Sequence, residues 1–184
     1  MDLNRSVRIL AISGSLRAAS SNRALLDMAA ALAPGSIEVS IYRDLAALPP
    51  FNPDVDGDAT PAAVSGFRAC LSACEAVLIA SPEYAHGVPG VLKNALDWIV
   101  GSGELIDKPV AVISASARSR YAWASLIETL TTMSARVIGE ASIAIPLQGR
   151  TLEAAKISGD LVLASALTSA LQALAAATRG ARGI

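Results

Sequence analysis

The chain has 184 residues, of which 53% are hydrophobic and only 4% aromatic, and its formal net charge is -1. This length suits one domain with one core, and the high apolar fraction excludes a disordered chain. The charges balance at 15 Lys and Arg against 16 Asp and Glu, and no dense basic stretch is present, which argues against nucleic-acid binding. We therefore expect residues 1–184 to form a single domain.

Five segments are predicted to be strands. Val7–Ser13, residues 76–81 and Pro109–Ser114 are almost wholly apolar, which is typical of parallel strands with helices on both faces of the sheet. Ile37–Tyr42 alternates apolar and polar residues, as a strand nearer an edge does. Residues 137–145 form a less regular fifth strand.

An apolar stripe at steps of three and four residues follows each predicted strand, which indicates five helices. The alternation of strand and helix predicts an α/β fold with right-handed crossovers, a parallel sheet and helices on both faces. Between the second strand and its helix, residues 48–61 are rich in Pro and Asp and are predicted to be a surface loop. The stripes are Leu25, Met28, Ala29, Leu32; Val64, Phe67, Leu71; Leu92, Ala95, Leu96, Ile99; Trp123, Leu126, Ile127, Leu130, Met133; and the leucines of residues 161–178.

Residues 161–178 carry no charge and reach the minimum length of a membrane span. Polar residues at 165, 169 and 172 fall off one apolar line, so the pattern predicts a core helix and no membrane partner. The N-terminus has no signal-peptide pattern, and we expect a cytoplasmic protein. The apolar line is Leu161, Ala164, Leu167, Leu171 and Leu174.

The two cysteines, Cys70 and Cys74, do not have the spacing of a redox or zinc motif. Cys74 continues the apolar line of its helix and is predicted to be a small buried residue. Because the chain has one histidine, His86, no metal site is expected.

The loop after the first strand, residues 13–22, is rich in groups that bind anions. Hydroxyls, an amide, an Arg guanidinium and the free N–H groups of a helix start can converge there on one phosphate, and Gly14 permits a tight turn. The alternative is that Ser20 or Ser21 caps the helix while Arg17 is a solvated charge, and both readings are compatible. The candidate phosphate ligands are Ser15, Arg17, Ser20 and Asn22.

Other phosphate and nucleophile motifs are missing from the sequence. It contains neither G-x-G-x-x-G after the first strand nor G-x-x-x-x-G-K-[ST], which excludes the usual dinucleotide and P-loop sites. Ser13-Gly14-Ser15 also departs from the G-x-S-x-G nucleophile elbow.

The loop after the third strand, residues 81–90, contains two prolines and two glycines that fix its backbone. Such a stiff loop can present N–H groups to the polar edge of a flat heterocycle while Pro82 or Tyr84 covers its face. In an open parallel sheet, ligands bind beyond the carboxyl ends of the strands where the strand order reverses, so the loops after strands one, three and four are predicted to lie nearest the ligand.

These two loops and the helix that follows the second resemble the NAD(P)H-dependent FMN reductases. The likeness lies in Gly14-Ser15-Leu16-Arg17, in Ser20-x-Asn22-Arg23 and in the run from Ser81-Pro82-Glu83-Tyr84 through Pro89-Gly90 to Asp97-Trp98. It implies a flavodoxin-like three-layer sandwich with five parallel strands in the order 2-1-3-4-5, noncovalent FMN, and a homodimer or homotetramer.

The resemblance also implies roles for particular residues. Ser15, Arg17, Ser20 and Asn22 would hold the FMN phosphate, while Pro82, Glu83, Tyr84 and Gly87 would line the isoalloxazine ring. The chain departs from the family where Ala85 replaces a frequent Asn, and where residues 114–121 lack a frequent Gly-rich run. No protein side chain is assigned to catalysis, because hydride transfer is the chemistry of the cofactor.

Several residues near these loops keep two readings. His86 either contacts the flavin or substrate or is exposed, and Arg118 and Arg120 either attract the phosphates of NADPH or are solvated. Trp98 and Trp123 either fill the core or form a subunit contact. The polar face of Lys93, Asn94 and Asp97 is expected to be solvated.

The preferred function is that of an enzyme that takes hydride from NADPH or NADH onto FMN and passes electrons to a small oxidised acceptor such as a flavin or quinone. The alternatives are a flavodoxin-type electron carrier and a flavin-binding regulatory module without turnover. A nearly neutral chain with an Arg-bearing phosphate loop favours the enzyme, because carriers often dock through a strongly acidic face.

Overall fold

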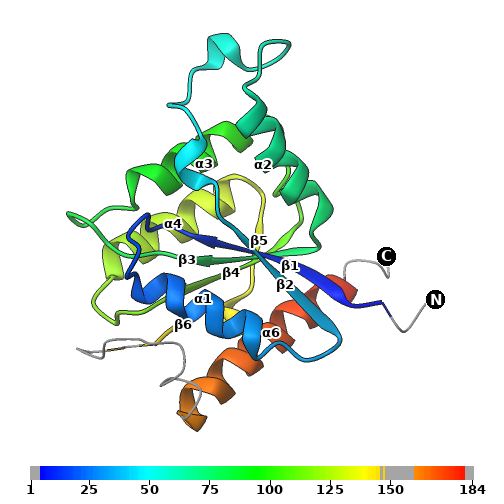
Figure 1. Cartoon of the computed structure of the whole chain (residues 1–184), viewed down its shortest axis with the longest axis vertical. Coiled ribbons are helices and arrows are strands. Elements are labelled where there is room, and N and C mark those ends of the chain that lie inside the picture. The colour runs from blue at the N-terminus through cyan, green and yellow to red at the C-terminus, as the bar shows by residue number, and fades with distance from the viewer. Residues whose placement is uncertain (1–4, 146, 148–159, 181–184) are drawn as a thin grey trace.

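The computed structural model describes residues 5–145, 147 and 160–180. Within them, strands and helices follow one another as predicted (Figure 1). The strands are β1 (Val7–Ser13), β2 (Ile37–Tyr42), β3 (Ala76–Ala80), β4 (Pro109–Ser114), β5 (Arg136–Val137) and β6 (Ile143–Ala144). The helices are α1 (Ser21–Ala31), α2 (Ala62–Ala73), α3 (Gly90–Val100), α4 (Arg120–Thr132) and α6 (Leu161–Gly180).

The strands form one parallel sheet in the order β2-β1-β3-β4-β5, which confirms the predicted flavodoxin-like topology. The register aligns the ends of the central strands, because Ser13 pairs with Ala80 and Ala80 with Ile113. The loops that follow β1, β3 and β4 therefore leave the sheet at one edge.

The predicted fifth strand, residues 137–145, is interrupted. The structure has a short 3₁₀ turn at Gly139–Ala141 between β5 and β6, and both two-residue strands pair with β4. Ser142 explains how β4 tolerates the interruption, since its hydroxyl accepts a hydrogen bond from Val112 N at 3.1 Å and donates one to Ile138 O at 2.9 Å. A side chain here replaces a backbone ladder bond, which an apolar pattern does not reveal.

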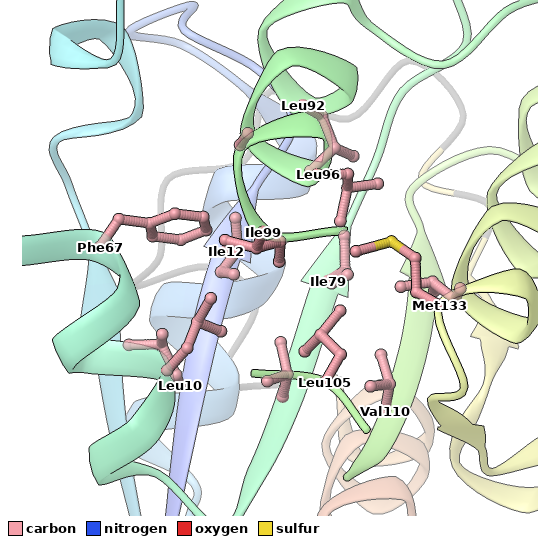
Figure 2. Packing of buried hydrophobic residues seen from close by; sticks show 14 of the residues in the cluster. Leu10, Ile12, Phe67, Ile79, Leu92, Leu96, Ile99, Leu105, Val110 and Met133 are labelled. Carbon is pink, nitrogen blue, oxygen red and sulfur yellow. The ribbon is translucent and has the colours of Figure 1, made fainter. Parts of the chain in front are cut away.

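Two apolar clusters cover the two faces of the sheet. Figure 2 shows part of the first, in which Phe67 of α2, Leu96 and Ile99 of α3 and Met133 after α4 pack over Ile12 of β1 and Ile79 of β3. The second cluster places α1 and α6 on the opposite face, with α1 and α6 below the sheet and α2 and α3 above it in Figure 1. The three layers follow from strands that are apolar on both sides.

Helix α6 is long and apolar enough to cross a membrane by length and composition, but its apolar face packs on the sheet. The predicted face was wrong at its start: Leu161 is 80% exposed, while Leu163 is 5% exposed. Asp160 caps the helix, because its carboxylate accepts a hydrogen bond from Leu163 N at 3.2 Å, and the buried face begins at Leu163. Leu167, Leu171 and Leu174 are buried as predicted.

Residues 48–61 form the predicted surface loop, and α3 holds its start. Asn94 Nδ2 and Trp98 Nε1 both donate to Pro49 O, at 2.9 Å and 2.7 Å, and Phe51 N donates to Asn94 Oδ1 at 2.7 Å. Trp98 is fully buried, so its core reading is confirmed, whereas the expectation of a solvated Asn94 is wrong. A buried indole N–H needs an acceptor, and the loop supplies it.

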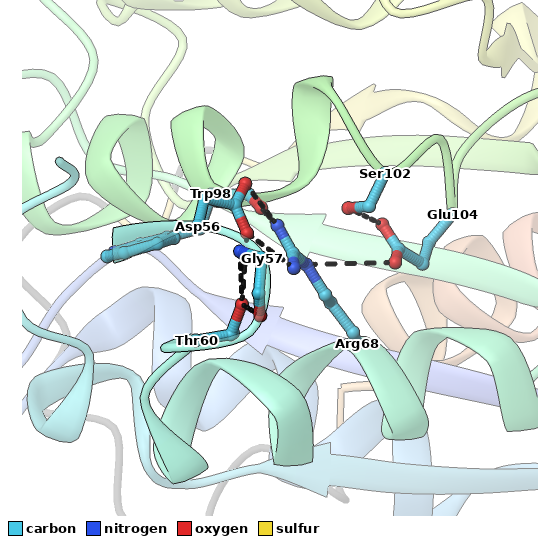
Figure 3. A network of polar contacts seen from close by, with 7 residues as sticks. All are labelled: Asp56, Gly57, Thr60, Arg68, Trp98, Ser102 and Glu104. Carbon is cyan, nitrogen blue, oxygen red and sulfur yellow. Dashed lines mark hydrogen bonds and ion pairs between the residues drawn. The ribbon is translucent and has the colours of Figure 1, made fainter. Parts of the chain in front are cut away.

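Arg68 of α2 holds the end of the same loop (Figure 3). Its guanidinium donates to both carboxylate oxygens of Asp56, at 2.8 Å and 2.9 Å, contacts Trp98 O, and lies 3.8 Å from a carboxylate oxygen of Glu104. The hydrogen bonds from Arg68 lower the pKa of Asp56 from its ordinary value. This network fixes the loop on the α2 and α3 side of the sheet.

Candidate functional site

The candidate site lies at the carboxyl edge of the sheet. Three loops meet this edge: residues 14–20 after β1, residues 81–89 after β3, and residues 115–119 after β4. β1 lies between β2 and β3, so the chain reverses its direction of winding beside it. Ligands of doubly wound sheets bind at such a point. We call residues 14–20 the phosphate loop and residues 81–89 the ring loop, after their predicted ligand groups.

Gly14 lets the phosphate loop turn closely against β3. Its N–H donates to Ala80 O at 2.8 Å. A Cβ atom at this position would lie 3.1 Å from Leu92 Cδ2 and 3.2 Å from Ser81 Oγ, which is tighter than ordinary contact. The glycine is therefore needed for close packing of the two loops.

Serine hydroxyls shape the rest of the phosphate loop. Ser13 Oγ accepts from Ser15 N at 3.3 Å, and Ser15 Oγ accepts from Arg17 N at 3.3 Å. Ser20 is the N-cap of α1, because its Oγ accepts from Arg23 N at 3.3 Å. The capping alternative considered for Ser20 is thus present in the structure. An accepting hydroxyl keeps its own proton, so Ser20 can still donate to a ligand.

The donors of the phosphate loop fit a phosphate group. Among the described residues, the backbone N–H groups of residues 18–22 have no hydrogen-bond partner, and the Arg17 side chain has no ion-pair partner. Arg17 is exposed at the same end of α1. A run of free N–H groups at a helix start beside a free guanidinium is the donor set that an anion takes.

A tight turn gives the ring loop its shape. Tyr84 N donates to Gly87 O at 3.2 Å, and Gly87 N donates to Tyr84 O at 2.9 Å, so the two residues close a two-residue turn. Both central residues have positive φ, 48° at Ala85 and 59° at His86. This backbone is that of a type I′ turn, which favours Asn and Gly. Ala85 holds this conformation at a cost of about 1 kcal/mol.

Three side-chain hydrogen bonds tie the loops and helix starts at this edge together. Ser15 Oγ lies 3.5 Å from Tyr84 Oη, which joins the phosphate loop to the ring loop. Asn22 Oδ1 accepts from Ala115 N at 3.0 Å, which joins α1 to the loop after β4. The third bond, from Ala122 N to Glu83 Oε2 at 2.8 Å, joins the ring loop to α4.

Glu83 acts as the missing cap of α4. The N-cap residue Ser119 makes no side-chain capping bond, so the carboxylate of Glu83, 39 residues earlier, accepts the N–H of Ala122. A negative charge at this end of a helix is favourable. The rings of His86 and Tyr121 stack beside it with their centroids 4.2 Å apart. The ring loop thus rests on the first turn of α4 through two contacts.

The structure brings all eight predicted site residues to the same edge. They lie on the phosphate loop (Ser15, Arg17, Ser20), on the first turn of α1 (Asn22) and on the ring loop (Pro82, Glu83, Tyr84, Gly87). Four of them also link the loops to one another or to α4: Ser15, Asn22, Glu83 and Tyr84. Sequence reasoning missed the part played by α4, whose Tyr121 and Ala122 meet the ring loop. No spacing signal reveals such contacts between residues 35 and 39 positions apart.

Metal-binding groups are not gathered here. Over the described parts of the chain, no three His, Cys, Asp or Glu side chains lie close enough to hold a metal ion. Cys70 is exposed, and Cys74 is buried as predicted, with burial raising the pKa of its thiol.

The topology and the two loops at the switch point define a flavodoxin-like protein, and comparison with known proteins agrees. Residues 7–149 match the family model described as NADPH-dependent FMN reductase. An NAD(P)H-dependent FMN reductase of Pseudomonas aeruginosa is 35% identical over 166 residues, covering 82% of this chain and 88% of the relative. The chain belongs to the NADPH-dependent FMN reductase family. The predicted enzyme class, an NAD(P)H-dependent oxidoreductase with FMN, is confirmed at the level of the family.

Further relatives and structures extend this result. A quinone reductase of Pseudomonas putida is 39% identical over 111 residues, which cover 59% of each chain. Among solved structures, the flavoenzyme NAD(P)H:(acceptor) oxidoreductase FerB from Paracoccus denitrificans has a TM-score of 0.69 at 23% identity, over 91% of this chain and 97% of that one. At this identity the structural likeness supports the fold.

Proposed function

We propose that the chain binds one FMN across the phosphate loop and the ring loop and works as an NAD(P)H-dependent reductase of flavins, quinones or other small oxidised acceptors. The observation that carries this proposal is the pair of loops at the switch point, one with free anion donors and the other a stiff turn. The quinone reductases among the relatives support the choice of acceptor.

The phosphate loop holds the phosphate in this proposal. Arg17 supplies the charge, while the hydroxyls of Ser15 and Ser20 and the free N–H groups of residues 18–22 supply directed hydrogen bonds. Asn22 contributes through its amide N–H groups, because its Oδ1 already accepts from Ala115 N.

The ring loop orients the flat part of the cofactor. Pro82, Tyr84 and Gly87 line it directly, while the carboxylate of Glu83 supports the loop from behind by binding α4. When bound, FMN supplies the hydride-accepting and electron-storing chemistry, so the chain needs no acid or base of its own for the first step. In this proposal the chain binds FMN, orients its ring and leaves one face of the ring open.

One open face predicts ping-pong turnover. The sequence has no separate dinucleotide fingerprint, so donor and acceptor must use the same face in turn. Initial rates measured across both NADPH and a soluble benzoquinone should give parallel double-reciprocal lines. Intersecting lines together with a ternary complex would contradict the shared face.

The same measurement separates the enzyme from its alternatives. An electron carrier or a regulatory module would bind FMN but would not turn over NADPH with a small acceptor. The three edge loops carry two arginines, Arg17 and Arg118, and one carboxylate, that of Glu83. This balance of charge does not resemble the acidic docking surface of an electron carrier. Failure to oxidise NADPH or NADH with flavin, quinone, azo or oxyanion acceptors would reject the enzyme.

A homo-oligomer, a cytoplasmic location and a single domain over residues 1–184 complete the proposal. A groove between α3 and α4 is lined by the apolar side chains of Leu96, Met133 and the exposed Val100. Its charged lining residues are one lysine, Lys93, and two acids, Asp97 and Glu128. Such a surface suits contact with a second copy. Light scattering at micromolar concentration should return at least twice the chain mass, and a monomer mass would contradict it.

A further inference from the structure

The strands on either side of β3 end in the same arrangement of residues. β1 leads into Ser13-x-Ser15-x-Arg17, and β4 leads into Ser114-x-Ser116-x-Arg118. Ser114 Oγ accepts from Ser116 N at 3.2 Å, and Ser116 Oγ accepts from Arg118 N at 3.2 Å, which repeats the bonding of the phosphate loop. Arg118 therefore has the same place after β4 that Arg17 has after β1.

The charges around these two turns are unbalanced. The three edge loops and the first residue of α4 carry three arginines, Arg17, Arg118 and Arg120, and one carboxylate. That carboxylate, on Glu83, is occupied by Ala122 N. Over the described residues, no carboxylate lies within ion-pair distance of any of the three arginines.

The two turns are separate sets of donors. β3 separates β1 from β4, so the two turns lie two strand spacings apart, roughly 10 Å. FMN carries one phosphate, which the proposed function assigns to the Arg17 turn. The cations of the other turn, Arg118 and Arg120, are both exposed, and the proposed function assigns them no group.

Resting on that proposed function, we propose that Arg118, assisted by Arg120, binds a phosphate of the nicotinamide donor and thereby favours the donor over the acceptor. The two substrates that share the open face differ most in charge: NADPH and NADH are polyanions, whereas a quinone is neutral. Arg120 lies 6.0 Å from the centroid of the Tyr121 ring, and neither Arg118 nor Arg120 has a carboxylate partner among the described residues, so both attract the first and do nothing for the second.

Ping-pong kinetics allow a direct test, because kcat/KM for donor and for acceptor report separate half-reactions. Arg118→Ala and the Arg118→Ala, Arg120→Ala double variant are compared with the wild-type holoenzyme. We expect kcat/KM for NADPH to fall about 5-fold to 10-fold in the single variant and further in the double variant. The value for a neutral benzoquinone should stay within about twofold, since no charge is involved.

Salt and a matched control sharpen the result. Raising the ionic strength should lower kcat/KM for NADPH in the wild type and have less effect in the double variant. Arg179→Ala, which removes an exposed arginine from the far end of α6, should change neither value. A larger loss with NADPH than with NADH places the contact at the 2′-phosphate, and an equal loss places it at the pyrophosphate.

Two outcomes would overturn the inference. Unchanged kcat/KM for the donor would show that the arginines are only solvated. An equal fall for donor and quinone would show that they act on the flavin or on the fold. Both differ from failure of the proposed function, in which the wild-type holoenzyme would oxidise neither nicotinamide.

Discussion

The phosphate loop and the ring loop meet at one edge but are built in opposite ways. Within the phosphate loop, hydroxyls bind backbone groups two or three residues away, and the N–H groups of residues 18–22 have no partner in the part of the chain that the structure describes. The ring loop relies on a strained turn and on α4, whose Ala122 lies 39 residues beyond Glu83. Short-range hydrogen bonds leave the backbone donors of the phosphate loop available to a ligand. The long-range contacts of the ring loop fix its backbone conformation.

The comparison predicts that removing a charge from the phosphate loop affects binding alone. Arg17→Ala should weaken FMN binding by about 1 to 3 kcal/mol, the range for a lost charge-assisted contact. The melting temperature of the FMN-free protein should not change, because the Arg17 side chain has no partner among the described residues. Titration of the FMN-free protein with FMN measures the effect.

Arg17→Lys provides the matched control for this variant. It keeps the charge and loses the planar donor set, so its affinity should fall between those of wild type and Arg17→Ala. Unchanged FMN affinity in Arg17→Ala would reject Arg17 as a phosphate ligand.

Removing the anchor of the ring loop should affect both stability and binding. Glu83→Ala leaves the N–H of Ala122 without its acceptor at the start of α4 and should lower the free energy of unfolding by about 1 kcal/mol. FMN affinity should also fall, because the loop loses its support. Denaturant unfolding and FMN titration measure the two effects.

Glu83→Gln separates the hydrogen bond from the charge. Its amide oxygen can still accept from Ala122 N, so most of the lost stability should return. If Glu83→Ala unfolds and binds FMN like the wild type, α4 is not the anchor of the ring loop.

The smallest expected effect concerns the strain in the turn. Ala85→Gly should raise the stability of the FMN-free protein by up to about 1 kcal/mol, because glycine adopts positive φ without a steric penalty. Ala18→Gly in the phosphate loop is the control, since Ala18 has no positive φ and glycine adds only chain entropy there. Equal effects of the two substitutions on thermal unfolding would show that Ala85 is not strained.

Sequence patterns predicted features that depend on neighbouring residues. The buried strands β1, β3 and β4 are continuous apolar runs, and the phosphate loop is a local cluster of donors, so both could be read directly. The cap of α4 by Glu83 and the replacement of a strand bond by Ser142 join distant segments, and no periodicity encodes them. The exposure of Leu161 was missed because a leucine in the first turn of a helix fits an apolar line whether or not it is buried.

Anaerobic reduction of the FMN-loaded protein tests the central claim most directly. If FMN lies at this edge with one open face, the protein should bind one FMN per chain, and NADPH alone should bleach the visible flavin absorption. Adding one equivalent of benzoquinone should then restore the absorption without further NADPH. FMN that does not bind, or bound FMN that NADPH leaves oxidised, would contradict the account.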